Sequence, residues 1–187
     1  MARIAILGWG SLIWCPRQLQ YEGEWQQDGP VLPIEFSRIS SDGRLTLVID
    51  TQRGVDTPTR FVASSHTDLK SAIENLRDRE CTLERNIGYI DVVNGQQRCR
   101  NGERVCQAIR DWAAELGFDA VIWTDLLPKF EEGKPFTVEN AVAYLQSLSP
   151  AKAACAREYI RNAPQEVDTP LRRRLDEVGW LDEEETQ

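Results

Sequence analysis

The stretch GWGSLIW at residues 8–14 combines residue types that can form a ligand-binding loop. It follows the run RIAIL, whose apolar character is typical of a first β-strand. Glycines let a main chain pass close to another group. The backbone N–H groups of Gly10, Ser11 and Leu12 would then be free to hold an anionic group or an amide oxygen.

Two other interpretations of this loop remain open. A strand followed by a tight turn would simply carry Leu12, Ile13 and Trp14 into the core. A dinucleotide-binding fingerprint would need a third small residue, and that position holds Ile13. The consecutive strands expected over residues 34–64 also differ from the alternating strands and helices of such a domain.

Glu80 is a carboxylate that the helical pattern places on an apolar face. Projected at about 100° per residue, residues 68–84 form one apolar stripe, and Glu80 falls near its middle. The stripe consists of Leu69, Ala72, Ile73, Leu76 and Leu83, whereas Glu74, Arg77, Asp78 and Arg79 point elsewhere. Burial raises the pKa of a glutamate, so a glutamate in such a place becomes a usable general base near neutrality.

Two structural alternatives compete with this role for Glu80, because a carboxylate rarely lies on a buried face without a partner. In the first, the helix ends near Asp78 and Glu80 lies in a solvated turn. In the second, Glu80 pairs with a buried arginine.

Other residues suggest catalytic pairs that the sequence favours less. Ser11 with His66 and an aspartate would form a triad, and Cys15 with His66 a thiol–imidazole pair. His66 is the only histidine, and its surroundings, ASSHTDL, predict a strand-to-helix turn. Asp125 ends a strand and either faces a cleft or opens a turn.

The composition fits a globular protein and argues against several classes of partner. Of the 187 residues 41% are hydrophobic and 28% charged, and the net charge of -8 argues against binding to nucleic acid. Five cysteines without a CxxC pair predict neither a zinc site nor a disulfide framework. We therefore expect reduced thiols, no metal and no cofactor.

The start of the chain is similar to a lipoprotein signal but departs from it at the decisive positions. Gly8, Gly10 and Ser11 interrupt the apolar stretch, and Trp14 precedes Cys15 where a small residue is required. No run reaches the roughly 18 apolar residues of a membrane span. These features predict a cytoplasmic protein with no membrane partner.

An α+β fold must position these residues. Strands are expected over residues 3–8, 34–39, 45–50, 60–64, 87–93 and 119–123. One helix should run to about residue 84 from a cap at Ser65 or Thr67, and a second should span 103–116 and stop at Gly117. The pattern predicts a mixed β-sheet or small barrel.

Residues after 135 predict helices only. Thr137, Ser149 and Thr169 suit helix caps, and the last two are followed by proline, which is favoured at the first helical position. We expect a single domain over residues 1–181, with a core at 1–125 and a helical extension at 136–181. Residues 182–187 should form an acidic tail.

Three motifs follow one another in the first half of the chain. They are Trp9-Gly10-Ser11-Leu12, then Leu76, Arg79 and Glu80, and then Gly88-Tyr89. Residues 3–93 thereby resemble the gamma-glutamylcyclotransferase superfamily, nearest to its ChaC-like, glutathione-degrading branch. There, a Y-G-S-L type loop precedes a glutamate in an L-x-x-R-E context and a Gly-Tyr strand.

The resemblance implies a small mixed β-barrel with flanking helices and a metal-independent enzyme of lyase or acyltransferase type. The α-amino group of a γ-glutamyl amide attacks its own γ-carbonyl, which yields 5-oxoproline and a free amine or peptide. The resemblance makes Glu80 the catalytic acid–base and assigns substrate binding to Trp9, Gly10, Ser11 and Leu12.

This chain departs from the family pattern at two places. Trp9 replaces the family's tyrosine and so lacks its hydroxyl, and SSDGRLTLVIDTQRGVDTP lacks the D-H-R-G type stretch of ChaC-like enzymes. The C-terminal helices are candidates for covering the site, for selecting the amine leaving group or for forming a homodimer contact. The alternative function is a non-catalytic small-molecule-binding or interaction domain on the same fold.

Overall fold

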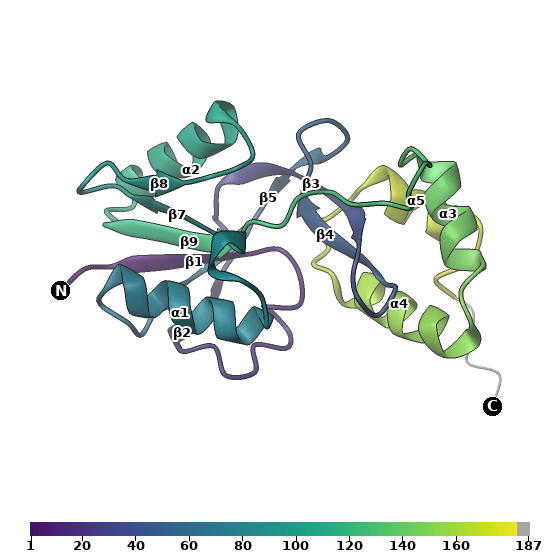
Figure 1. Cartoon of the computed structure of the whole chain (residues 1–187), viewed down its shortest axis with the longest axis horizontal. Coiled ribbons are helices and arrows are strands. Elements are labelled where there is room, and N and C mark those ends of the chain that lie inside the picture. The colour runs from purple at the N-terminus through teal and green to yellow at the C-terminus, as the bar shows by residue number, and fades with distance from the viewer. Residues whose placement is uncertain (183–187) are drawn as a thin grey trace. The chain divides into compact units, whose positions relative to one another are not determined.

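The computed structural model describes residues 1–182, which fall into two compact units (Figure 1). The first comprises Met1–Leu32 and Pro58–Leu126, and the second comprises Pro33–Thr57 and the chain from Leu127 onward. The chain contains both β-strands and α-helices, which confirms the α+β class. The predicted core at 1–125 differs from the first unit, because residues 33–57 group with the C-terminal helices. The predicted tail lies, from residue 183, outside the described residues.

The first unit is built on a six-stranded mixed sheet in the order β2-β6-β1-β9-β7-β8. Its strands are β1 (Ile4–Gly8), β2 (Tyr21–Gln26), β6 (Arg60–Ser64), β7 (Ile87–Asp91), β8 (Gln97–Arg98) and β9 (Ala120–Thr124). The central strands β1 and β9 run parallel, with Ile6 opposite Ile122. Parallel central strands are apolar throughout because both faces of the sheet are covered.

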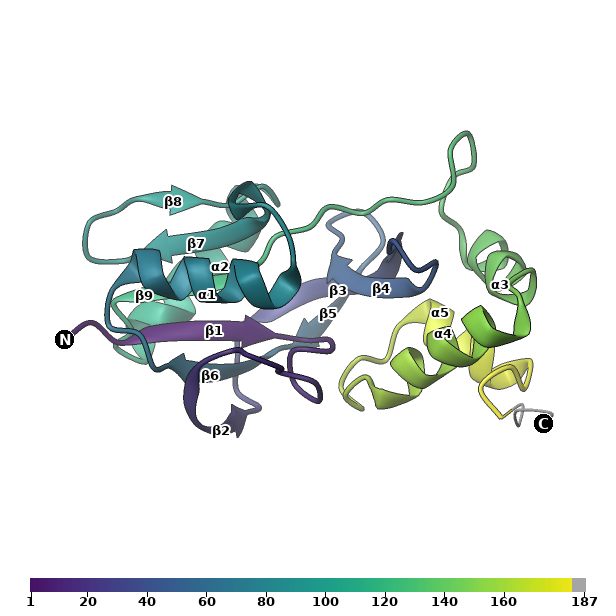
Figure 2. The same ribbon diagram turned by 60° about the horizontal axis from the view of Figure 1, so that its bottom comes forward.

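Helix α1 (Leu69–Glu80) covers one face of this sheet, as Figures 1 and 2 show. Its Ala72, Ile73 and Leu76 pack in one cluster with Ile4, Ile6, Ile87 and Ile122 of the strands. Helix α2 (Glu103–Glu115) lies on the opposite face, where Trp112 packs edge-on against Phe61 at 4.9 Å between ring centroids. The short 3-10 helix η1 (Glu84–Asn86) leads into β7.

Both ends of α1 differ from the sequence prediction. The N-cap is Asp68, whose carboxylate accepts a hydrogen bond from the Ser71 N–H, rather than Ser65 or Thr67. The helix ends at Glu80 rather than near residue 84, because Cys81 adopts a left-handed conformation with φ of 48°. Leu83 therefore leaves the helical stripe and is exposed.

Trp123 of β9 is completely buried and lies opposite Gly88 of β7. A Cβ atom at Gly88 would lie 2.3 Å from Cε2 of this indole, so only glycine fits there. The indole N–H of Trp123 donates to Asp125 (3.1 Å). The contacts of Trp123 with Gly88 and Asp125 thereby hold strands β7 and β9 together at the end of β9.

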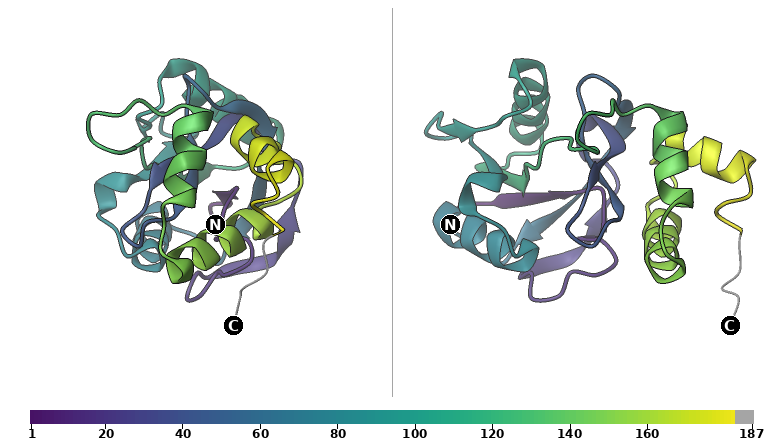
Figure 3. Two further views of the ribbon diagram at one scale, coloured as in Figure 1. Left: turned by 90° about the vertical axis from the view of Figure 1, so that its right-hand side faces the viewer. Right: turned by 45° about the vertical axis from the view of Figure 1, so that its right-hand side comes forward.

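The second unit contains a three-stranded sheet, β4-β3-β5, and three helices. They are β3 (Val31–Ile39), β4 (Leu45–Ile49), β5 (Val55–Pro58), α3 (Val138–Gln146), α4 (Pro150–Asn162) and α5 (Pro170–Glu177), the helices being green to yellow in Figure 3. Thr137, Ser149 and Thr169 are their N-caps, as predicted. Tyr159 of α4 packs against Phe36 and accepts a hydrogen bond from the Leu47 N–H.

The predicted small barrel is wrong, since neither sheet closes on itself within residues 1–182. Residues 34–49 pair with β5 in a sheet of their own instead of joining β6. Strands β2, β5 and β8 were not predicted. None of the helices described here is long and apolar enough to cross a membrane.

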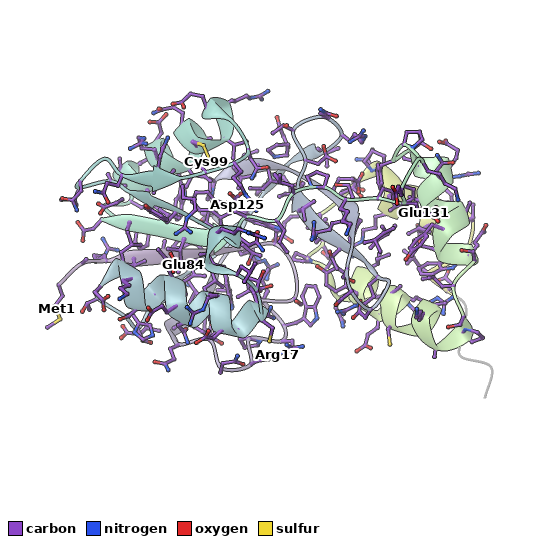
Figure 4. The ribbon with its side chains drawn as sticks, in the orientation of Figure 1. Met1, Arg17, Glu84, Cys99, Asp125 and Glu131 are labelled. Atoms are coloured by element: carbon purple, nitrogen blue, oxygen red, sulfur yellow. A yellow bond between two sulfur atoms is a disulfide. The ribbon has the colours of Figure 1, made fainter. Side chains whose placement is uncertain are left out.

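Cys99 and Cys106 form a disulfide, contrary to the expectation that all thiols are reduced (Figure 4). Cys99 precedes α2 and Cys106 lies in its first turns, which brings their Cα atoms within 6.1 Å. The two cysteines are seven residues apart, so they do not form the CxxC spacing. Cys15, Cys81 and Cys155 are free.

Glu35 is a buried carboxyl group in the second unit, only 1% exposed. Burial raises the pKa of Glu35 from 4.5 to about 7, and nearby Asp50 adds to the rise. Hydrogen bonds from the Thr169 hydroxyl and from the N–H groups of Phe36 and Leu171 oppose it. The carboxyl group thereby attaches the start of α5 to β3.

We predict that the free energy of unfolding falls as pH rises between 4.5 and about 7. A raised pKa means that the folded protein holds this proton more tightly than the unfolded chain, so stability is lost as the proton leaves. The loss should be about 3 kcal/mol and should disappear in Glu35→Gln. Urea unfolding at pH 5 and pH 8 measures it, with exposed Glu132→Gln as the matched control. A Glu35→Gln variant with an unchanged pH dependence would contradict the prediction.

Candidate functional site

The loop after β1 forms a tight turn that leaves three amides unused. The N–H of Ile13 donates to the carbonyl of Gly10 (3.0 Å), and that of Cys15 donates to Ser11 (2.8 Å). Within residues 1–182, the N–H groups of Gly10, Ser11 and Leu12 donate to no backbone carbonyl. These are the donors that the sequence predicted for an anionic group or an amide oxygen.

Part of the same loop contributes side chains to the hydrophobic core. The interpretation as a strand followed by a tight turn predicted this. Leu12 and Trp9 are each 6% exposed, and Leu12 belongs to the cluster beneath α1. Gly8 ends β1 under the indole of Trp25, where a Cβ atom would lie 2.7 Å from the ring. The apolar side chains thus anchor the loop while its amides remain available.

Arg79 joins this loop to Glu80. Its Nη1 donates to Glu80 Oε1 (2.5 Å), and its Nη2 donates to the Cys15 carbonyl (2.5 Å) and the Ser11 hydroxyl (3.3 Å). Arg79 is 4% exposed, whereas 17% of the Glu80 side chain is exposed. The guanidinium therefore connects the carboxylate with a side chain and a carbonyl of the loop.

These contacts decide between the alternatives for the structure around Glu80. The helix does not end near Asp78, and Glu80 does pair with a buried arginine. The prediction that Arg79 points away from the apolar face is wrong. The buried stripe is centred on Ala72 and Leu76, which turns it toward Arg79 and leaves Glu80 at its edge.

A second set of hydrogen bonds fastens the loop to α1. Asn75 accepts from the Gln20 N–H (2.8 Å) and donates to the Gln18 carbonyl (3.2 Å). The Gln18 side chain donates to the Asp78 carbonyl (3.0 Å). The loop is therefore tied to the C-terminal half of α1 at several points.

The alternative catalytic pairs are not assembled. Ser11 interacts with Arg79, Cys15 is exposed, and neither is hydrogen-bonded to His66 in the part of the chain that the structure describes. Asp125 is buried and accepts hydrogen bonds from Trp123, Asn101 and the Arg100 N–H. Asp125 therefore joins β9 to the loop beside the disulfide and does not face a cleft.

The five residues that the sequence assigned to the site fall into one region. Trp9, Gly10, Ser11 and Leu12 lie in the loop, and Arg79 connects it to Glu80. The connecting role of Arg79 was missed, because the sequence does not show where a long side chain ends. Among residues 1–182, no three His, Cys, Asp or Glu side chains form a metal-binding group.

A cavity of about 480 Å³ lies elsewhere in the first unit. Met1, Ile4, Leu69, Asp91 and Asp119 are among its lining residues. Among them, Ile4 begins β1 and Leu69 begins α1, whereas Gly8 and Glu80 end the same two elements. The cavity is therefore separate from the candidate site.

No protein-family model, no curated protein and no solved structure matches the chain. The interpretation of its function therefore depends on the chemistry of the loop, Arg79 and Glu80, together with the motif resemblance.

We predict that Arg79→Met lowers the free energy of unfolding by about 2 kcal/mol, because it leaves the Cys15 carbonyl and the Glu80 carboxylate without their donor. Urea denaturation measures this change. Arg77→Met is the matched control, since Arg77 pairs with Asp78 at the surface and its loss should have little effect. Equal stability of the two variants would show that the Arg79 contacts contribute nothing.

Proposed function

We propose that this protein is a gamma-glutamylcyclotransferase-like enzyme that converts a γ-glutamyl amide into 5-oxoproline and a free amine or peptide. The pairing of Glu80 with a buried arginine is by itself the structural alternative stated above. The observation that supports an enzymatic role is that the same arginine also reaches Ser11 and Cys15, which joins the Glu80 carboxylate to a loop with three unused amides. An acid–base group and an anion-binding main chain are the two parts that the reaction requires.

The proposal extends to the fold and to the setting of the reaction. We regard the mixed sheet of the first unit, with α1 against it, as the counterpart of the family's barrel and flanking helix, left open in this chain. A small-molecule γ-glutamyl substrate and a cytoplasmic location belong to the same proposal. A homodimer contact through the C-terminal helices remains part of it.

The chemistry needs neither a nucleophilic side chain nor a metal. Glu80 takes a proton from the substrate's α-ammonium group, and the freed amine attacks the γ-carbonyl carbon. As the ring closes, the amide C–N bond breaks and Glu80 returns the proton to the leaving nitrogen. The ring nitrogen then gives up its second surplus proton through the same carboxylate, and the released amine takes it up as an ammonium group. Holding the substrate folded back is a large part of catalysis, since effective molarities in such reactions reach about 10⁵ M.

The loop amides and Arg79 have distinct tasks in this scheme. The N–H groups of Gly10, Ser11 and Leu12 stabilise the negative charge that develops on the γ-carbonyl oxygen. Arg79 donates to Glu80 and to the loop, so it keeps the proton carrier at a fixed place relative to those amides.

Glu80→Gln should reduce the formation of 5-oxoproline by at least about 10³-fold, because the amide cannot carry a proton. Mass spectrometry of the products from γ-glutamyl amino acids, γ-glutamylamines and glutathione measures this. Glu84→Gln is the control, since 56% of that side chain is exposed and it pairs with Arg98 outside the loop. Undiminished turnover in Glu80→Gln rejects the assignment.

A non-catalytic binding domain is the second candidate, and the ion pair between Arg79 and Glu80 supports it. A paired carboxylate needs no proton transfer in order to bind an ammonium group. This candidate differs from the first in one observable, because γ-glutamyl compounds would raise the melting temperature without giving any product.

A further inference from the structure

Thr124 has a buried hydroxyl group with no hydrogen-bond partner in the described residues. It is the last residue of β9. Burying a hydroxyl without a partner costs stability, and most buried polar groups in proteins are paired. An unpaired group of this kind calls for an explanation.

The strand register places Thr124 beside the candidate loop. In the parallel pair of β1 and β9, Ile4 is opposite Ala120 and Ile6 is opposite Ile122. Two residues beyond the last of these pairs, β1 ends at Gly8 and β9 ends at Thr124. Ligands of sheets with parallel strands bind outside the carboxyl ends of those strands, and both strands end here.

The side chain of Thr124 is on the face that α1 covers. Ile122, two residues earlier, and Ile87, directly opposite Thr124 on β7, both belong to the cluster that contains Leu76 of α1. Side chains two apart in a strand lie on the same face. The Thr124 hydroxyl therefore lies between the sheet and the helix that carries Arg79 and Glu80.

Helix α1 runs in the same direction as β1 and β9 (Figure 2). At one end Leu69 lines the same cavity as Ile4 and Ala120, which begin the two strands. At the other end Arg79 contacts Ser11 and Cys15, just after β1. The last turn of α1 and Thr124 thus lie at the same end of the helix–sheet interface.

Arg79 adds a second unsatisfied group at this end, because its Nε is also buried without a partner among residues 1–182. A guanidinium N–H and a hydroxyl are donors that suit a carboxylate oxygen. Glu80, beside Arg79, suits an ammonium group. The two donors match the α-carboxylate of an amino acid, and Glu80 matches the α-ammonium on the same carbon atom.

We propose that Thr124 is a substrate-binding residue and that its hydroxyl, with Arg79, holds the α-carboxylate of a γ-glutamyl compound. This inference rests on the proposed function and makes it more specific. The carboxylate goes to Arg79 and Thr124, the ammonium to Glu80, and the loop amides are left for the γ-carbonyl oxygen. Amides of 4-aminobutanoic acid, which cyclise in the same way but lack the carboxylate, are then poor substrates.

The test compares Thr124→Val, which removes the hydroxyl and keeps the shape, with Thr124→Ser, which keeps the hydroxyl. With γ-glutamyl-alanine, Thr124→Val should raise KM about tenfold with little change in kcat, and Thr124→Ser should stay within about twofold of the wild type. With 4-aminobutanoyl-alanine, kcat/KM should be the same for all three. The melting temperature of Thr124→Val should equal or exceed that of the wild type.

The outcomes separate the two proposals. An active wild type with an unchanged KM in Thr124→Val, or a Thr124→Val variant that melts well below the wild type, overturns the role of Thr124 and leaves the proposed function standing. A wild type without turnover rejects the proposed function. Calorimetry with γ-glutamyl-alanine then decides the inference: about tenfold weaker binding to Thr124→Val supports it, and equal or absent binding overturns it.

Discussion

The buried guanidinium of Arg79 is the interaction on which the candidate site depends. It replaces water around three groups at once: the Glu80 carboxylate, the Ser11 hydroxyl and the Cys15 carbonyl. Arginine suits this place because its planar fork offers several donors in fixed directions and its charge persists when it is buried. Lysine would offer a compact charge without donors in these fixed directions. Together with the hydrogen bonds of Asn75 and Gln18, this side chain therefore holds the loop and the end of α1 in one relative geometry.

The fold brings the C-terminal ends of α1, β1 and β9 together, so residues far apart in the sequence reach one region. Their contributions are complementary: main-chain donors from the turn after β1, opposite charges from α1, and a hydroxyl from β9. Positive and negative groups side by side suit a zwitterion better than a ligand with a single charge. The apolar cluster beneath α1 fills the middle of the helix–sheet interface, so these polar groups lie at its end.

The sequence predicted what local patterns control. Central strands such as β1 and β9 are continuous apolar runs, and the caps Thr137, Ser149 and Thr169 are local signals. It missed β2, which carries charges and a glycine, and β5, which ends in a proline, because neither has an alternating apolar pattern. At the site it predicted the loop and Glu80. The direction of Arg79 and the place of Thr124 depend on packing and strand register, which no local pattern encodes.

The packing of Trp123 on Gly88 has a consequence for how the Gly-Tyr motif is understood. An indole occupies the space in which any side chain at residue 88 would have to lie. The position of the Trp123 indole therefore explains why residue 88 is a glycine, and the glycine needs no role in chemistry. Larger residues there would push β7 from its neighbour and shift Ile87, which faces the hydroxyl-bearing end of β9. Architecture, rather than catalysis, accounts for this part of the signature.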